Sequence, residues 1–227
     1  MQRFTQRARK KFATLEKRRA HCGRPTQFDF RRRENQALVP RAPANSATLI
    51  CVPLAAIALG SNLASHAGPP EATLAAAADR LASSGRIVAR SSLYSTAPVG
   101  FVNQPRFVNA VLLLEASLAP RELLKKLLEI ERDFGRKRID AVLNGPRPLD
   151  LDLILYGDLV LHESELELPH PRFAERAFVL VPLNEIAPEL RDPRTGLAVS
   201  QLAARLPEDA NAASRIENEH WAAKIFS

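Results

Sequence analysis

Two aspartates in an otherwise apolar segment are the residues of this sequence best placed to do chemistry. Asp150 and Asp152 alternate with leucines between Leu149 and Tyr156, a pattern that predicts a β-strand. Because side chains two residues apart on a strand point to the same face, the two carboxylates should lie side by side. Such like charges repel each other, and a divalent cation such as Mg²⁺ removes the conflict. Two solvent-facing acids on an edge strand would have the same spacing, so the pattern alone leaves both interpretations open.

Arginines gather just before these aspartates. Arg147 lies between Pro146 and Pro148, whose rings restrict the backbone and hold the guanidinium upstream of the carboxylates. A fixed planar cation beside a Mg²⁺ site suits a phosphate chain. A second basic group, at 136–138, follows the end of a predicted helix, where its cations could instead interact with the helix dipole. The polar run 135–145 nevertheless has the character of a loop that can close over a nucleotide.

The elements that must position these groups follow one another in a familiar order. Hydrophobic periodicity predicts strand, helix, strand, strand, helix and strand at residues 55–59, 70–83, 86–93, 107–115, 120–135 and 149–156. This β-α-β-β-α-β order is that of a ferredoxin-like sheet. The predicted fold class is therefore α+β, with helices packed on the sheet and a C-terminal extension. Gly60-Ser61-Asn62 is interpreted as a polar turn after the first strand.

Charge is distributed unevenly along the chain. The net charge is +7, yet residues 1–47 contain 13 Lys and Arg against 3 Asp and Glu, which leaves 19 basic and 22 acidic residues for 48–227. The basicity thus belongs to the first segment. We predict a basic, disordered tail at 1–47 and a folded domain at 48–227. Nucleic-acid contact or organelle targeting would also fit the composition of the tail.

Composition also disfavours several classes of protein. Cys22 and Cys51 do not form a disulfide framework, which favours a reduced, cytoplasmic setting. The apolar stretch 49–59 contains Pro53 and is shorter than the ~20 residues that span a bilayer, so we expect no membrane segment. An RNA-binding module would need an aromatic stacking strand that this sequence lacks, and paired carboxylates would repel a nucleic-acid backbone. A Mg²⁺-dependent phosphohydrolase remains an alternative, and it would need an activated water and a base.

Short motifs between residues 55 and 190 occur in the order typical of one enzyme family. They are Gly60-Ser61-Asn62, Tyr94 to Gly100, Gln104 to Ala110, Glu131 with Gly135-Arg136, Gly145 to Asp152, Pro169 to Phe178, and Pro182 to Pro188. In these motifs the chain resembles the 6-hydroxymethyl-7,8-dihydropterin pyrophosphokinase family of folate biosynthesis. The resemblance implies transfer of pyrophosphate from ATP to the hydroxymethyl group of the pterin, with release of AMP. It also implies a monomer, and the charge distribution described above leads us to expect no nucleic-acid partner.

The same resemblance implies a role for each motif residue. Asp150 and Asp152 would bind two Mg²⁺ ions that bridge the ATP phosphates and the pterin hydroxymethyl oxygen. The residues implied to contact the nucleotide are Arg136 and Arg147, as catalytic groups on the phosphates, with Arg138, His170, Arg176 and Glu131. The residues implied to bind the pterin are Thr96 and Asn109 by hydrogen bonds, Ala97 and Val99 through their backbone, and Phe107 and Phe178 as the two sides of an aromatic sandwich.

The chain departs from the family pattern at four places. Ala97 replaces a proline, Pro148 replaces a threonine, and Phe107 lacks the hydroxyl common at its position. The segment 142–144 reads Val-Leu-Asn where the family usually carries an Arg-Trp pair. The family's lid Arg-Trp pair therefore does not transfer to this chain, and lid closure and nucleotide affinity should differ. The predicted reaction does not depend on them.

Overall fold

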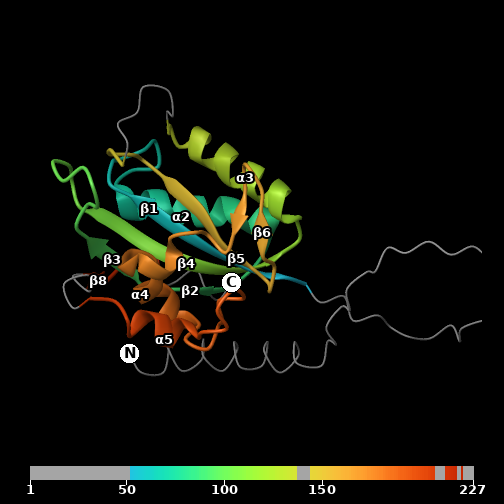
Figure 1. Ribbon diagram of the computed structural model, residues 1–227. Coiled ribbons are helices and arrows are strands. Elements are labelled where there is room, and N and C mark those ends of the chain that lie inside the picture. The colour runs from blue at the N-terminus through green and yellow to red at the C-terminus, as the bar shows by residue number, and fades with distance from the viewer. Residues whose placement is uncertain (1–51, 137–143, 208–212, 219–220, 222–227) are drawn as a thin grey trace, which may run out of the picture.

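The computed structural model describes residues 52–136, 144–207, 213–218 and 221 (Figure 1). The predicted tail, Arg138 and both cysteines lie outside these ranges. The elements are β1 (Leu54–Ser61), α2 (Pro70–Leu81), η1 (Ala82–Ser84), β2 (Gly85–Arg90), β3 (Leu93–Thr96), β4 (Phe107–Ala116), α3 (Pro120–Asp133), β5 (Asp150–Tyr156), β6 (Leu161–His162), β7 (Glu167–Leu168), η2 (Phe173–Glu175), α4 (Ala177–Ile186), α5 (Val199–Ala203) and β8 (Ser214–Ile216). No helix in the described part of the chain is long and apolar enough to cross a membrane.

Six strands form one antiparallel sheet. Its order is β5-β1-β4-β3-β8, and β2 pairs with the edge of β4 that also carries β3. Helix α2 joins β1 to β2, and α3 joins β4 to β5. The predicted β-α-β-β-α-β order is therefore confirmed, and with this strand order it is ferredoxin-like.

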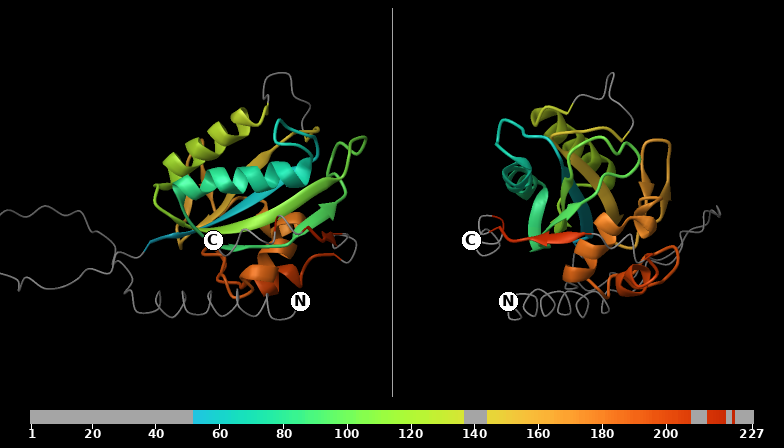
Figure 2. Two further views of the ribbon diagram at one scale, coloured as in Figure 1. Left: turned by 180° about the vertical axis from the view of Figure 1, so that it is seen from behind. Right: turned by 90° about the vertical axis from the view of Figure 1, so that its left-hand side faces the viewer.

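Helices α2 and α3 cover one face of this sheet (Figures 1 and 2). In α2 the buried side chains include Leu74, Ala78 and Leu81, which share one side of the helix because they recur every three or four residues. Gly135, with φ of 88°, ends the turn after α3, as its position in the sequence predicts. The two helices thus pack an apolar stripe onto the alternate leucines and alanines of β1, β4 and β5.

The opposite face, called here the α4 face, is covered over only part of its length. Helix α4 packs there on apolar side chains of β1, β4 and β5, including Ala58, Val111, Leu113 and Ile154. Alternation continues along the same strands beyond the helix, where the side chains become polar. Gly60, Asn109, Asp150 and Asp152 occupy these positions, called here the polar end of the α4 face.

The strand predicted at 86–93 is in fact broken. Residues Ser91 and Ser92 separate β2 from β3. Val111 N–H donates to the Ser91 hydroxyl at 2.9 Å instead of to its carbonyl, and that carbonyl accepts the indole N–H of Trp221 at 2.6 Å. The side chain of Ser91 thus replaces a ladder acceptor, and its carbonyl binds a residue far along the chain.

The prediction of a polar turn at Gly60-Ser61-Asn62 is wrong for its first two residues. Gly60 and Ser61 belong to β1, and the backbone of Gly60 is paired with β4 on one side and with β5 on the other. Only Asn62 lies beyond the strand. The glycine therefore stands inside the sheet, where pairing on both sides overrides its turn propensity.

The C-terminal part of the described chain closes the edge of the sheet. Strand β8 pairs with β3, and Trp221 is buried under the guanidinium of Arg90 at 5.4 Å. Glu185 on α4 accepts hydrogen bonds from the Ser92 backbone and hydroxyl, both at 2.7 Å, and from the Tyr94 hydroxyl at 3.1 Å. Burial and this carboxylate raise the pKa of Tyr94. The strand that carries Thr96 is thus held from both sides.

Candidate active site

Three neighbouring strands place the candidate site in one row across the sheet. Gly60 of β1 is directly opposite Asn109 of β4 and directly opposite Asp150 of β5. Two residues further along both strands, Ala58 of β1 is opposite Asp152 of β5. The carboxylates predicted to share a face therefore do so, on the face that also carries Asn109.

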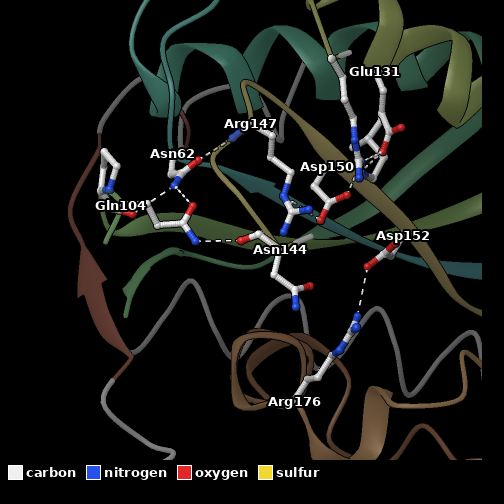
Figure 3. Close-up of polar contacts among 11 residues, drawn as sticks. Asn62, Gln104, Glu131, Asn144, Arg147, Asp150, Asp152 and Arg176 are labelled. Carbon is white, nitrogen blue, oxygen red and sulfur yellow. Dashed lines mark hydrogen bonds and ion pairs between the residues drawn. The ribbon is translucent and has the colours of Figure 1, made fainter. Parts of the chain in front are cut away.

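Arginines surround the two carboxylates (Figure 3). Arg136 Nη1 bridges Asp150 Oδ1 and Glu131 Oε1. Arg147 Nε lies 3.4 Å from Asp150 Oδ2, and Arg176 Nη1 donates to Asp152 Oδ2 at 3.3 Å. Three guanidiniums from three different segments thus converge on one pair of carboxylates.

Glu131 supports this arrangement from inside the protein. Its side chain is 1% exposed, and Oε1 accepts the Leu151 N–H at 2.9 Å as well as the Arg136 guanidinium. The resemblance placed Glu131 among the nucleotide contacts. In the structure its carboxylate is bound to Arg136, one of the arginines predicted to contact the phosphates.

Electrostatics at the site follow from burial and proximity. Burial, and then the charge of Asp150, raise the pKa of Asp152, and the nearby arginines only partly oppose them. Burial alone would lower the pKa of Arg136, but the Asp150 and Glu131 carboxylates outweigh it, and the pKa is raised. Asp152 is therefore less readily ionised than a free aspartate, and a cation bound beside it would favour its ionised form.

His170 lies at the rim of the same site and is neutral at pH 7. Burial, with the positive charge of Arg176, lowers its pKa to about 4. Its Nδ1 accepts the Arg172 N–H at 3.2 Å, so the neutral ring carries its proton on Nε2. His170 can thus donate a hydrogen bond to an anion without carrying a positive charge.

Asn62 and Gln104 fix the backbone that carries Arg147 (Figure 3). Asn62 Oδ1 accepts the Arg147 N–H at 2.8 Å, and Asn62 Nδ2 donates to Gln104 Oε1 at 2.9 Å. Gln104 Nε2 continues to the Asn144 carbonyl at 2.8 Å. Both residues belong to motifs that the sequence displays, but no role followed from their types. Their function emerges only when three loops meet.

Several residues predicted to hold the pterin lie on the β4 side of Gly60, away from the two aspartates of β5. Asn109 is 5% exposed, and its Nδ2 donates to Thr96 Oγ1 at 2.8 Å. The Arg147 guanidinium lies 5.4 Å from the centre of the Phe107 ring. The rings and amide thus border the carboxylate site, and the same arginines touch both parts.

The remaining predicted residues lie at the margins of the site. The Arg176 guanidinium lies 5.5 Å from the centre of the Phe178 ring, in the first turn of α4. Ala97 and Val99 are exposed in the loop after β3, Val99 to 61%. Arg138, which the resemblance assigned to the nucleotide, lies outside the described residues.

Comparison with known proteins identifies the family. The family model for 7,8-dihydro-6-hydroxymethylpterin-pyrophosphokinase (HPPK) matches residues 56–188. The chain belongs to this family. An HPPK of Pseudomonas aeruginosa is 45% identical over 151 residues, which are 66% of this chain and 90% of that protein. An HPPK of Synechocystis is 52% identical over 99 residues, 44% of this chain and 50% of that protein.

Other relatives and solved structures contain HPPK as part of a longer chain. The "Folate synthesis bifunctional protein, mitochondrial" of Arabidopsis thaliana is 45% identical over 132 residues. These residues are 57% of this chain and only 23% of that protein. A crystal structure of HPPK-DHPS from Plasmodium falciparum superposes with a TM-score of 0.54 at 16% identity, covering 72% of this chain and 47% of that one. At that identity the superposition supports the fold alone, and it agrees with the ferredoxin-like order described above.

Proposed function

We propose that this HPPK chain transfers pyrophosphate from ATP to the hydroxymethyl group of 6-hydroxymethyl-7,8-dihydropterin and releases AMP. One observation carries the proposal. Asn109, Gly60 and Asp150 form a single row across three strands, so a ring held at Asn109 has its substituent directed to carboxylates ringed by arginines. That order matches a substrate with a flat head and a short arm that meets a phosphate chain.

The residues at the polar end fit a Mg²⁺ site that nucleotide completes. Asp150 and Asp152 offer oxygen ligands on one face, and within the described ranges no group of three or more His, Cys, Asp or Glu could hold a metal ion without other ligands. Mg²⁺ commonly takes one or two carboxylates together with substrate phosphates and water. Bound there, Mg²⁺ would supply charge neutralisation at the phosphates and at the attacking oxygen. Two ions, as the resemblance implies, would be shared by the two carboxylates.

Arg136, Arg147, Arg176 and His170 are the groups that we assign to the phosphates. In the free protein the three arginines are partners of Asp150 and Asp152. Metal at the carboxylates and phosphate at the guanidiniums would satisfy both sets of charges at once. Mg²⁺ without nucleotide must instead compete with the arginines. We expect Mn²⁺ to bind weakly alone and much more tightly with a non-hydrolysable ATP analogue, which a paramagnetic titration can measure.

The reaction itself requires positioning more than a reactive side chain. The hydroxymethyl oxygen attacks the β-phosphorus in line, the bond to the bridging oxygen of the α-phosphate breaks, and AMP leaves with that electron pair while the hydroxyl proton is released. Thr96 and Asn109 would orient the ring, and Phe107 and Phe178 would exclude water from its faces. Backbone groups of Ala97 and Val99 would complete its edge.

One assay separates this reaction from hydrolysis. The protein is mixed with ATP, Mg²⁺ and reduced hydroxymethylpterin, and nucleotides are separated by chromatography. We expect AMP only when the pterin is present. AMP or ADP formed from ATP without the pterin would favour a phosphohydrolase and contradict the proposal.

The wider context of the enzyme is also proposed. We infer a catalytic domain at 48–227 that acts as a cytoplasmic monomer without a nucleic-acid or membrane partner, and a tail at 1–47 that is dispensable for catalysis. The support is the location of every assigned residue after position 54 and the excess of acidic residues in that domain. Deleting 1–47 should leave turnover and the thermal midpoint nearly unchanged, and a loss of either would contradict this division.

A further inference from the structure

Gly60 is a glycine whose backbone does not require glycine. It lies within β1, paired on both sides, and it is not among the residues with positive φ. Any residue can adopt the extended conformation of a strand, and glycine there weakens the sheet. The reason for glycine must therefore be the space that a side chain would occupy.

That space lies between the two halves of the candidate site. A Cβ at Gly60 would lie 3.0 Å from Asn109 Oδ1, 3.8 Å from Asp150 Cβ and 4.0 Å from Phe107 Cδ1. The contact with the amide is closer than a side chain normally tolerates, and the other two are ordinary contacts. A methyl group at this point would fill the floor between Asn109 and the metal ligands.

The row is also the right length for the substrate. Neighbouring strands lie about 4.8 Å apart, so the backbones at Asn109 and Asp150 are about 10 Å apart with Gly60 midway. A ring that hydrogen-bonds to Asn109 must send its arm over Gly60 to reach a phosphorus near Asp150. Ala58, the next residue on this face of β1, is also small and lies opposite Asp152.

We infer that Gly60 is a specificity-determining residue, which keeps the floor of the site clear for the one-carbon arm that joins the pterin ring to the attacked phosphorus. The inference rests on the proposed function and deepens it. Gly60 selects for a pterin whose 6-substituent is short and unbranched, because the space above it is bounded by Asn109, Asp150 and Phe107, all within 4 Å of the position that a Cβ would take. Loss of one methylene's worth of space in a fitted pocket typically costs about tenfold or more in discrimination.

The test compares two pterins on the Gly60→Ala variant. Fluorescence titrations with 6-hydroxymethylpterin and with unsubstituted pterin are made in the presence of Mg²⁺ and a non-hydrolysable ATP analogue. We expect the ratio of the two affinities, which favours the hydroxymethyl compound in the natural protein, to fall by about tenfold in Gly60→Ala. Affinity for the ATP analogue should be retained. An unchanged ratio, with both pterins weakened equally, would mean that the methyl group acts only by displacing Asn109, and would overturn the inference.

Two further measurements keep the test decisive. Gly196→Ala replaces a glycine with φ of +73° and no neighbour within 4 Å of the added carbon, so it strains the fold far from the site and should leave the ratio unchanged. If Gly60→Ala does not fold, the natural protein is titrated with 6-(1-hydroxyethyl)pterin, whose branched arm should bind about tenfold more weakly than the hydroxymethyl arm. Equal affinities would overturn the inference. Failure of the natural protein to bind any pterin would instead contradict the proposed function.

Discussion

The two ends of the α4 face are built from the same strands and serve different purposes. At one end β4 and β5 present Leu113 and Ile154 to helix α4, and at the other end they present Asn109 and Asp150 beyond the helix. The backbone pattern is the same in both places, with every second side chain on this face. What differs is coverage. The candidate active site lies beyond the end of helix α4, where polar and charged side chains take the strand positions that apolar side chains occupy under the helix.

Replacing the two aspartates of the polar end with asparagine should have the largest effect on activity. Asp150→Asn and Asp152→Asn should each lower AMP formation at least about a hundredfold, because neutral amides bind a divalent cation poorly. The apolar end is untouched, so both variants should fold. Thermal unfolding with and without Mg²⁺ and an ATP analogue should show that the ligand-dependent stabilisation is lost. Near-normal turnover in both variants would contradict the proposed metal site.

The two variants should differ in stability without ligand. The pKa of Asp152 is raised, so its ionised form costs free energy in the folded state at neutral pH, and the cost disappears as the pH falls below the unfolded value of 3.8. Asp152→Asn should therefore raise the melting temperature. Asp150 is a partner of both Arg136 and Arg147, so Asp150→Asn should lower it. A gain for Asp150→Asn would mean that Arg136 and Arg147 do not stabilise the Asp150 carboxylate.

Truncating a side chain at the apolar end should have the opposite profile. Leu113 is fully buried on the same face and strand as Asn109. Leu113→Ala should lower the free energy of unfolding by about 2–5 kcal/mol, measured by urea denaturation. Turnover at temperatures where the variant is folded should remain near that of the natural protein. Leu113→Met, which nearly conserves volume, is the matched control. A selective loss of turnover would show that the two ends are not separable.

Phe107 tests the border between ring and phosphate. Phe107→Ala should weaken pterin binding by about 1–3 kcal/mol through lost aromatic burial and stacking. Binding of an ATP analogue should change less, although the Arg147 guanidinium lies over this ring. Phe107→Tyr keeps the ring and adds the hydroxyl common in the family, so it should preserve both affinities. Equal losses for both ligands would contradict the sandwich assignment, which Phe178→Ala tests from the other side.

His170 should give the smallest effect, a change in pH dependence. NMR titration should place its imidazole midpoint near 4, with His170→Gln used to assign the signal. Above pH 6.5 both folded and unfolded states are neutral at this residue. Between pH 6.5 and about 4 only the unfolded chain takes up the proton, so the free energy of unfolding decreases as the pH is lowered. His170→Gln should make this pH dependence weaker. A midpoint near 6.5 would contradict the burial described here.

Local pattern was sufficient to predict the frame of the molecule. Helices α2 and α3, strands β1, β4 and β5, and the shared face of Asp150 and Asp152 all follow from periodicity, because neighbours in the sequence determine them. The resemblance supplied the roles of the other site residues, and these roles remain proposals. The structure brings most of the proposed residues around one row, with Arg138 outside the described ranges.

Features that depend on distant contacts could not be predicted. The hydrogen bond from Trp221 to the Ser91 carbonyl joins distant parts of the chain, and the role of Asn62 depends on its contacts with Gln104 and Arg147. The turn predicted at Gly60 is wrong because glycine after an apolar run favours a turn, whereas pairing with two strands at once holds this glycine in the sheet. Strand β8 is short and polar, and its place in the sheet depends on β3.

The pairing of β3 with β8 also orders events during synthesis. Among the described strands, only β8 covers the outer edge of β3, and its residues are translated long after Thr96 has left the ribosome. The nascent chain can complete the helices and the other strand pairs while that edge still lacks its neighbour. An unpaired edge is a template for association with other chains. The edge of β3 therefore remains open to such association until β8 has been made and has paired with it.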